Sequence, residues 1–324
     1  TISGNLSVDG GTIKLDGNYP TGTGNVALGN LALDDGSLSG NYNVAIGNAS
    51  LSSNTTGVAN MSMGASSMLS NTTGNNNIAI GHLSLTSNVT GDNNVAVGRE
   101  ALENNTASQN TAVGYQALED NTTGSALASL GYLALNANTT GNFNTAVGNN
   151  SLKTNTTGSH NTALGHESLE ANTGSYNTAV GSKALELNTS SNNTAVGYLS
   201  LAVNTSGFSN VALGYQALYS NTTAGNNTAL GTEALRLNTT GTGNVSVGAD
   251  SLKNNISGSN NTVVGSGALN ANTASNNTAV GYQALNDNTS GTLNTAVGYS
   301  AGLQTTTGGK NAFFGNSAGQ NNTT

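Results

Sequence analysis

Small, apolar and polar residues alternate in a short pattern that recurs along almost the whole chain. The phrase Asn-Thr-Ala-Val-Gly occurs at residues 110–114, 144–148 and 294–298, and related phrases recur in register with it. We number each copy from its final glycine, with positions before and after it written −1, +1 and so on. There are eighteen copies, whose glycines are Gly29, Gly47, Gly64, Gly81, Gly98, Gly114, Gly131, Gly148, Gly165, Gly181, Gly197, Gly214, Gly231, Gly248, Gly265, Gly281, Gly298 and Gly315. Their spacing is 16, 17 or 18 residues, mostly 17, which is typical of a solenoid.

The positions before the glycine predict a short strand with two different faces. Position −1 is apolar in every copy, −2 is Ala or Ser in sixteen, and −4 is Asn in all but Leu127. Such alternation with a period of two is typical of β-structure. After the glycine, +3 is Ala or Ser, +4 is Leu or Met in the first sixteen copies, and +7 is Asn in sixteen. We therefore predict an all-β repeat solenoid, a parallel β-roll or β-helix of about eighteen coils of 16–18 residues.

Each coil is expected to turn at its Asn-Thr-Thr-Gly segment, because the shorter copies lose their residue there, as at 105–108. A turn absorbs a deletion, whereas a strand would exchange its faces. The segment after the glycine has two interpretations: a second strand with bends, or one turn of helix, since Tyr115 to Asp120 includes good helix formers.

The charged residues support this register. Of nineteen beyond residue 28, seventeen lie at +1, +2, +5 or +6, and only Asp92 and Lys310 lie elsewhere. These positions are expected to face water, because an unpaired buried charge is very costly. Equivalent residues of neighbouring coils stack, so we expect Glu167 to pair with Lys183 and Lys153 with Glu170.

The small residues at −2 define a continuous strip, formed by Ala27, Ala45, Ala79, Ala96, Ala112, Ala146, Ala163 and Ala179. We expect the interior to hold the apolar −1 side chains and the +4 leucines. The alanine strip would then lie outside, as the seam of a homotrimer. In the alternative, alanine simply fits inside a narrow coil. The Asn side chains at −4, such as Asn94 and Asn177, are expected to stack as a ladder and to satisfy corner backbone groups.

Two segments are expected: residues 1–24, a β-hairpin cap or the end of a preceding domain, and residues 25–324, the solenoid. The chain begins at Thr1 and stops within an Asn-Asn-Thr-Thr phrase, so we expect it to be a fragment of a longer protein. Asn-x-Thr/Ser sequences, as at Asn54, Asn71, Asn138 and Asn155, are interpreted as corner chemistry rather than glycosylation sites.

Composition narrows the function classes. The chain has no Cys, and only 7% of its residues are charged. This excludes a disulfide or cysteine-metal framework, and seven scattered Lys and Arg residues do not favour nucleic-acid binding. No run approaches the ~20 apolar residues that a membrane helix needs, so we expect no membrane insertion.

No catalytic, metal or cofactor site is predicted, and we do not expect an enzyme. His82 and His166 share position +1 in coils five apart, too far to bind one metal, and His160 lies in a corner; all three are interpreted as surface residues. The nearest paired carboxylates, Glu167 with Glu170 and Glu100 with Glu103, lie among the other exposed charges. Tyrosines recur at +1: Tyr115, Tyr132, Tyr198, Tyr215, Tyr282 and Tyr299. They either stack on sugars or shield the backbone beside the glycine.

Two resemblances follow from these phrases. Asn-Thr-Ala-Val-Gly with a downstream Ala-Leu resembles the head repeats of YadA-like trimeric adhesins, which form left-handed parallel β-rolls with a shorter period. The Gly-Tyr-Gln-Ala-Leu sequences at 114–118, 214–218 and 281–285, with the lead-in at 11–20, look like tail-fibre proteins of marine tailed phages that infect cyanobacteria.

The resemblance implies a homotrimeric fibre shaft of a phage tail, located in the virion and outside cells. Its partners would be two further copies, tail or baseplate proteins, and a host cell-surface receptor or glycan. A bacterial surface adhesin or an extracellular fibril subunit is the alternative. A minor alternative is an ice-binding solenoid, for which the corner threonines would form the contact, although Val89 and Ile256 interrupt them.

Overall fold

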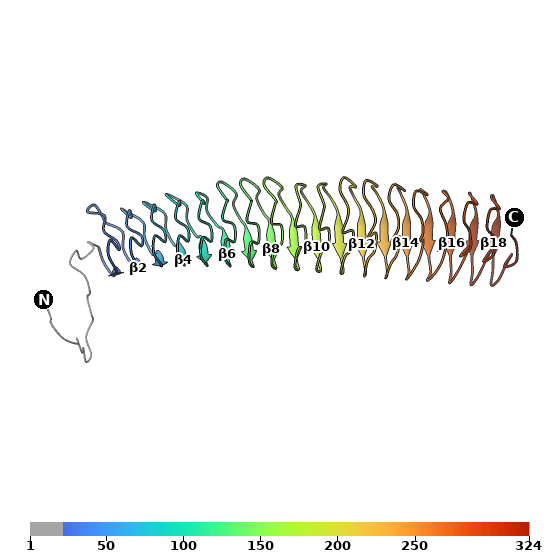
Figure 1. Ribbon diagram of the computed structural model, residues 1–324, viewed down its shortest axis with the longest axis horizontal. Helices are drawn as coiled ribbons and strands as arrows, with labels where there is room; N and C mark the ends of the chain where they lie inside the picture. The colour runs from blue at the N-terminus through green and yellow to red at the C-terminus, as the bar shows by residue number, and fades with distance from the viewer. Residues whose placement is uncertain (1–21, 324) are drawn as a thin grey trace, which may run out of the picture. The chain divides into compact units, whose positions relative to one another are not determined.

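The computed structural model describes residues 22–323 (Figure 1). The chain falls into two compact units, divided between Thr123 and Gly124. Every strand has three residues and occupies positions −3 to −1, as predicted. The first unit contains β1 (Val26–Leu28), β2 (Val44–Ile46), β3 (Met61–Met63), β4 (Ile78–Ile80), β5 (Val95–Val97) and β6 (Thr111–Val113). The second contains β7 (Ala128–Leu130), β8 (Thr145–Val147), β9 (Thr162–Leu164), β10 (Thr178–Val180), β11 (Thr194–Val196), β12 (Val211–Leu213), β13 (Thr228–Leu230), β14 (Val245–Val247), β15 (Thr262–Val264), β16 (Thr278–Val280), β17 (Thr295–Val297) and β18 (Ala312–Phe314).

Successive strands within each unit pair in parallel and in phase. Ala179 of β10, for example, lies opposite Ala163 of β9 and Ala195 of β11. The 16- and 17-residue coils keep the same register because their length difference lies in the corner. The predicted parallel β-solenoid is confirmed.

The segment after each glycine is neither a second strand nor a helical turn; residues 22–323 contain no helix. It is a run of turns in which +2 and +4 are left-handed, as in Lys183 with φ 58° and Leu185 with φ 53°. The amide of Lys183 therefore donates backward to the His166 carbonyl, at 2.9 Å, and that of Leu185 forward to Ser200, at 3.1 Å. Left-handed residues at +2 and +4 thus point the backbone amides toward the neighbouring coils. The hydrogen bonds made there offset the cost of a left-handed leucine, about 1–2 kcal/mol.

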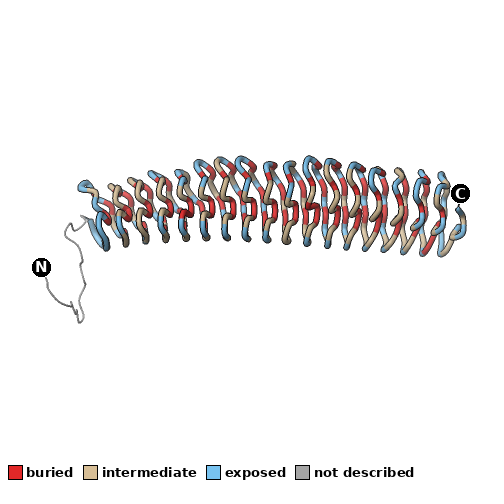
Figure 2. The backbone as a smooth tube through the Cα atoms, viewed as in Figure 1, coloured by how far each residue is buried: buried red, intermediate tan, exposed pale blue. Residues whose placement is uncertain are grey.

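The predicted orientation of the strand is wrong. The −2 alanines are inside: Ala112, Ala146 and Ala179 have no exposed surface. The apolar −1 residues point outward, so Leu130 is 50% exposed and Leu164 47%. Apart from the first and last coils of the described residues, buried positions recur in the same places from coil to coil within each unit (Figure 2). Because a 17-residue coil encloses little space, the fully buried leucine at +4 favours a small residue across from it, and Val263 in β15 is the largest residue that is fully buried at −2.

Phe313 shows the same constraint from the other side. It replaces the −2 alanine in β18. Position +4 is glycine both in the coil that contains β18, Gly319, and in the coil before it, Gly302. A Cβ on Gly302 would lie 2.7 Å from the Phe313 ring. Loss of the leucine at +4 therefore compensates for the large residue at −2.

Two ladders of buried asparagines confirm the predicted amide stacking. At −4, the Asn161 Oδ1 accepts from the Asn177 amide at 3.0 Å, and its Nδ2 donates to the Gly174 carbonyl at 2.9 Å. At +7, the Asn172 Nδ2 donates to the Asn155 Oδ1 at 3.0 Å and to the Gly174 carbonyl at 2.8 Å. Each corner is thereby tied to side chains of its own coil and of the preceding coil.

The expected hairpin or domain end at residues 1–24 lies outside the described residues, except for 22–24, which form bends. The Glu167–Lys183 pair is confirmed, with Nζ and Oε2 2.8 Å apart. The second expected pair is not: among residues 22–323 there is no ion pair between Lys153 and Glu170.

Candidate functional site

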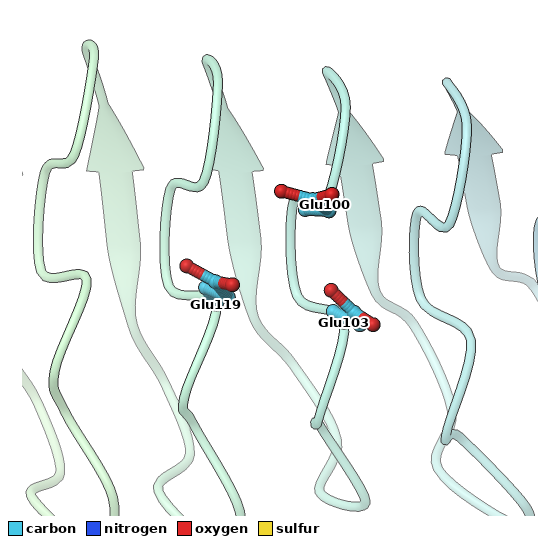
Figure 3. A group of neighbouring side chains, drawn as sticks. All are labelled: Glu100, Glu103 and Glu119. Atoms are coloured by element: carbon cyan, nitrogen blue, oxygen red, sulfur yellow. The ribbon is translucent and has the colours of Figure 1, made fainter.

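Three carboxylates from two coils meet in the first unit. Glu100 and Glu103 come from positions +2 and +5 of one coil, and Glu119 from +5 of the next (Figure 3). One oxygen of each lies within 4.8 Å of the others. The turns after the glycine place +2 and +5 beside each other, so carboxylates at these positions gather across coils.

Polar contacts hold this group together. The Arg99 Nη2 lies 2.7 Å from the Glu100 Oε1. The Gln116 Nε2 donates to the Glu100 Oε2 at 2.9 Å and to the Glu119 Oε1 at 3.2 Å. Glu100 is only 8% exposed, so the prediction that every +2 charge faces water is wrong here. Its ion pair with Arg99 and its bond from Gln116 make this burial tolerable.

The Glu103 carboxyl is affected by its own burial and by the negative charges of Glu100 and Glu119. Its partial burial raises the pKa of its carboxyl, and the neighbouring Glu100 and Glu119 raise that pKa further. The folded chain therefore binds this proton more tightly than the unfolded chain does. The stabilising contribution of the Glu103 proton is complete below the unfolded pKa, and it is lost as the pH rises through the folded value.

The second unit has the same arrangement with a lysine at its centre. Glu167, Glu170 and Glu186 occupy the equivalent positions, and Lys183 stands where Gln116 stands in the first group. The Lys183 Nζ lies 2.8 Å from Glu167 and 2.7 Å from Glu186. Its hydrogen bond lowers the pKa of Glu167, and both carboxylates raise the pKa of Lys183. An ammonium group thus already fills the place between these carboxylates.

We expect Gln116→Lys to stabilise the first unit by about 0.5–1 kcal/mol at neutral pH, the range of well-placed surface ion pairs. The new ammonium would reproduce the bonds that Lys183 makes to two carboxylates. It would also lower the pKa of Glu103, so the gain should shrink as the pH falls through the carboxyl range. Urea unfolding at several pH values measures both effects.

Gln283→Lys is the matched control, because position +2 of the neighbouring coils holds Gly267 and Ser300 instead of a carboxylate. Its effect is expected to be near zero and independent of pH. Equal effects of the two substitutions would contradict the role assigned to the three carboxylates.

The paired carboxylates named from the sequence are thus brought together, and each pair gains a third member that the sequence prediction missed. The missing signal was the register itself: Glu119 and Glu186 occupy the same +5 position one coil later. In the first group the carboxylates contact the Arg99 guanidinium and the Gln116 amide, and in the second they contact the Lys183 ammonium group. Both arrangements act as coil-to-coil contacts.

The three histidines are exposed and lie apart, as predicted. His160 is sandwiched between Phe143 and Tyr176, with ring centroids 4.9 and 5.0 Å away. The His166 Nδ1 lies 3.5 Å from the Glu167 Oε2. His82 lies at +1 of an earlier coil. None of them belongs to a group of three potential metal ligands among residues 22–323.

The tyrosines at +1 are exposed, and two pairs of them stack. Tyr198 and Tyr215 have centroids 5.9 Å apart, and Tyr282 and Tyr299 have centroids 5.4 Å apart. In the first unit, the Arg99 guanidinium lies 5.8 Å from the Tyr115 ring centroid. The second unit therefore carries two separate pairs of stacked tyrosine rings.

The corner residues are occupied by structural bonds. Asn54, Asn71, Asn138 and Asn155 are fully buried, and each donates its Nδ2 to a corner carbonyl, as Asn54 does to Gly57 at 3.0 Å. The atom that a glycan would modify is thus engaged inside the folded coil. The corner threonines also donate to the next coil, as Thr189 does to the Thr205 carbonyl at 2.7 Å.

In each unit, the outer face of the strands carries exposed apolar side chains. Its exposed side chains at −3 and −1 include Val26, Leu28, Met61, Met63, Leu130, Leu164, Val211, Leu213, Leu230, Val245, Val264, Val297 and Phe314. We call this surface the outer strip. Positions −4 to −1 carry no charged residue in any described strand.

Within residues 22–323 there is no helix of the length and apolar character needed to cross a membrane. Comparison of the sequence with known protein families gives no match, and comparison with curated proteins gives none either.

Proposed function

We propose that the chain is the shaft of a phage tail fibre, built as a homotrimer that presents receptor-binding parts for attachment to the host. The observation that carries this proposal is the outer strip. Apolar side chains that face outward on strand after strand are costly in water and favour burial against another surface.

The size of the outer strip fits an interface. In the second unit it covers twelve strands, which at about 4.8 Å each and about 10 Å of width gives on the order of 500 Å². That is comparable to the largest apolar patch of a typical monomeric soluble protein, and such patches are often functional. Two copies meeting over it would bury roughly 1,000 Å², the lower end of specific interfaces.

The charges of the chain support a partner of the same kind. The net charge is −8, yet the outer strip contains none of that charge. Copies of the chain can therefore meet there without like-charge repulsion, while the charged positions stay on other parts of the coil. The proposal of three chains rests on the resemblance to trimeric adhesin heads. The surface proposed for their contact is now the outer strip, in place of the buried alanines.

The repeated contacts inside the coils also fit the role of a shaft. Most coils within a unit repeat the same three-residue strand, a leucine at +4 and asparagines at −4 and +7, so that length is added without a new kind of contact. Fibres that hold a binding part away from a particle need such a spacer.

The test is the native mass by light scattering. We expect a value near three times 32.1 kDa for the wild-type chain. Glutamates at Leu164 and Leu213, both on the outer strip, should reduce it to 32.1 kDa, because the seam would then contain unpaired charges. Ala249→Glu, at the exposed +1 position, is the control and should leave the mass unchanged.

A wild-type mass of 32.1 kDa would contradict the homotrimer, and a very large, polydisperse mass would instead favour the extracellular fibril or bacterial adhesin. Circular dichroism of each variant separates loss of assembly from loss of the fold.

Ice binding remains a second candidate because of one specific feature of the outer strip. Thr178 and Thr194 project from β10 and β11 on the same side as Val180 and Val196, which forms a flat, uncharged array of hydroxyl and methyl groups. The corner threonines are the weaker candidates, since their hydroxyls bond to carbonyls. A thermal hysteresis assay tests this; a monomer that shows hysteresis would favour ice over the fibre.

A further inference from the structure

The +1 tyrosines follow a second, longer repeat. Ser182, Tyr198 and Tyr215 occupy +1 in three successive coils, and Ser266, Tyr282 and Tyr299 repeat the same order five coils later. The offset is 84 residues for each of the three positions. Both sets lie in the second unit, so the same short arrangement is presented twice along one row.

Each set contains a prearranged aromatic surface. The first tyrosine stacks on the second, with an interplanar angle of 19° in both pairs. Their rings are 46–56% exposed. Because each coil advances the row by about 4.8 Å, the other side of the first tyrosine faces the coil that carries serine. The second tyrosine thus holds the first in place, and the serine is too small to cover its free face.

The first unit shows what such a face accepts. Arg99 and Tyr115 are at the same two positions as Ser182 and Tyr198, and the Arg99 guanidinium lies over the Tyr115 ring. The face of a tyrosine at this position is therefore accessible to a side chain from the +1 position of the preceding coil, here the cationic guanidinium of Arg99. Where serine replaces arginine, the corresponding place is open to a group from another molecule.

We propose that Ser182 with Tyr198, and Ser266 with Tyr282, form two equivalent sites for the sugar rings of a neutral polysaccharide. The C–H face of a sugar ring is apolar and packs on tyrosine, while its hydroxyls bond to polar groups such as the serine hydroxyl. This deepens the proposed function, because it gives the fibre shaft its own contact with a host glycan.

Charge selects a neutral polymer. At the second site, the neighbouring +2 residues are Gly267 and Gln283, which carry no charge. At the first, Lys183 is already paired with Glu167 and Glu186. Neither site thus offers a free cation, and the chain as a whole is negative, which disfavours acidic polysaccharides and nucleic acids.

Two sites on one row suit a repetitive ligand. Five coils place them about 24 Å apart in the same unit. A long glycan that reaches both binds the second site intramolecularly, which multiplies its apparent affinity by about 10²–10⁴ without any new contact. Weak binding of single sugars then becomes useful adhesion to a surface covered with one polymer.

The experiment is surface plasmon resonance of the full chain on immobilised homopolysaccharides of glucose, mannose and galactose, with alginate as the acidic comparison. We expect binding to at least one neutral polymer. Ser182→Arg copies Arg99 and fills one site, so it should weaken binding about 10²-fold through loss of bivalency. Ser182→Arg with Ser266→Arg should abolish it.

Ala249→Arg is the matched control, because it adds the same side chain to the same row between Thr232 and Ser266, with no tyrosine in the adjacent coils. It should bind as the wild type does. No binding to any of the three neutral polymers, stronger binding to alginate, or unchanged binding by the double variant would overturn the proposal.

Light scattering on the same samples keeps the two proposals separate. A trimer that binds no neutral polymer would contradict only the sugar sites. A monomer that binds one, and loses binding in the double variant, would contradict only the fibre shaft.

Discussion

Gly197→Ala is expected to destabilise the second unit by about 2–6 kcal/mol. Gly197 has a φ of 129°, a conformation that residues with a Cβ rarely adopt, which costs about 1–3 kcal/mol. The new Cβ would also lie 2.5 Å from the Gly214 carbonyl oxygen and 2.7 Å from its carbon. These are backbone atoms of the next coil and cannot rotate away, so overpacking adds about 1–3 kcal/mol more. Urea unfolding of the full chain measures the loss.

Gly243→Asn is the control for this substitution. Gly243 has a φ of 68°, and asparagines already occupy its position in the neighbouring coils, Asn226 at 61° and Asn260 at 58°. The added side chain would meet only the amide of Asn260, which can move. Its effect is expected to stay within about 0.5 kcal/mol. Similar losses from both substitutions would show that the repeat glycines do not act through contact between coils.

The strands and the asparagine ladder could be predicted from the sequence because both depend on register alone. A period of two at Thr178, Ala179 and Val180 indicates a strand wherever it lies. An asparagine at one fixed position per coil must meet its equivalents, since parallel stacking brings identical residues together. Neither prediction needs the width of the coil.

The orientation of the strand could not be predicted in the same way. Alternation shows that Ala179 and Val180 face opposite sides, but it does not say which side is inside. The usual expectation places the larger apolar residue in the core. Here the opposite wall carries the fully buried Leu185, and the small side chain of Ala179 fills the space that remains across from it. The width of the coil depends on the left-handed residues after the glycine, and their composition gave no sign of that geometry.

The surface groups were predictable to the extent that they follow the register. Glu167 and Lys183 pair because they share position +2 in adjacent coils. The approach of Glu186 to Lys183 links +2 to +5 and depends on the turns between them. The stacking of Tyr198 on Tyr215 follows from a shared position, whereas the presence of Arg99 over Tyr115 depends on its rotamer.

Asn161→Ala is expected to cost the second unit about 1.5–4.5 kcal/mol. The side chain is fully buried and serves two backbone groups, the Asn177 amide and the Gly174 carbonyl, at 3.0 and 2.9 Å. Alanine leaves the Asn177 amide inside the coil with no partner, which costs about 1–3 kcal/mol. The Gly174 carbonyl keeps only its bond from the Asn172 Nδ2, so the lost second bond adds about 0.5–1.5 kcal/mol. The urea midpoint of the full chain should fall, and limited proteolysis should begin near the Gly174 corner, where the lost bond held the chain.

Asn149→Ala removes the same side chain from an exposed +1 position and is expected to change stability by less than about 0.5 kcal/mol. The comparison separates the ladder from the general effect of asparagine, which is abundant throughout the chain. If both variants unfolded at the wild-type midpoint, the ladder would contribute nothing to stability, and the recurrence of asparagine at −4 would need another cause. A loss confined to Asn161→Ala would instead identify the amide ladder as the contact that joins each coil to the next.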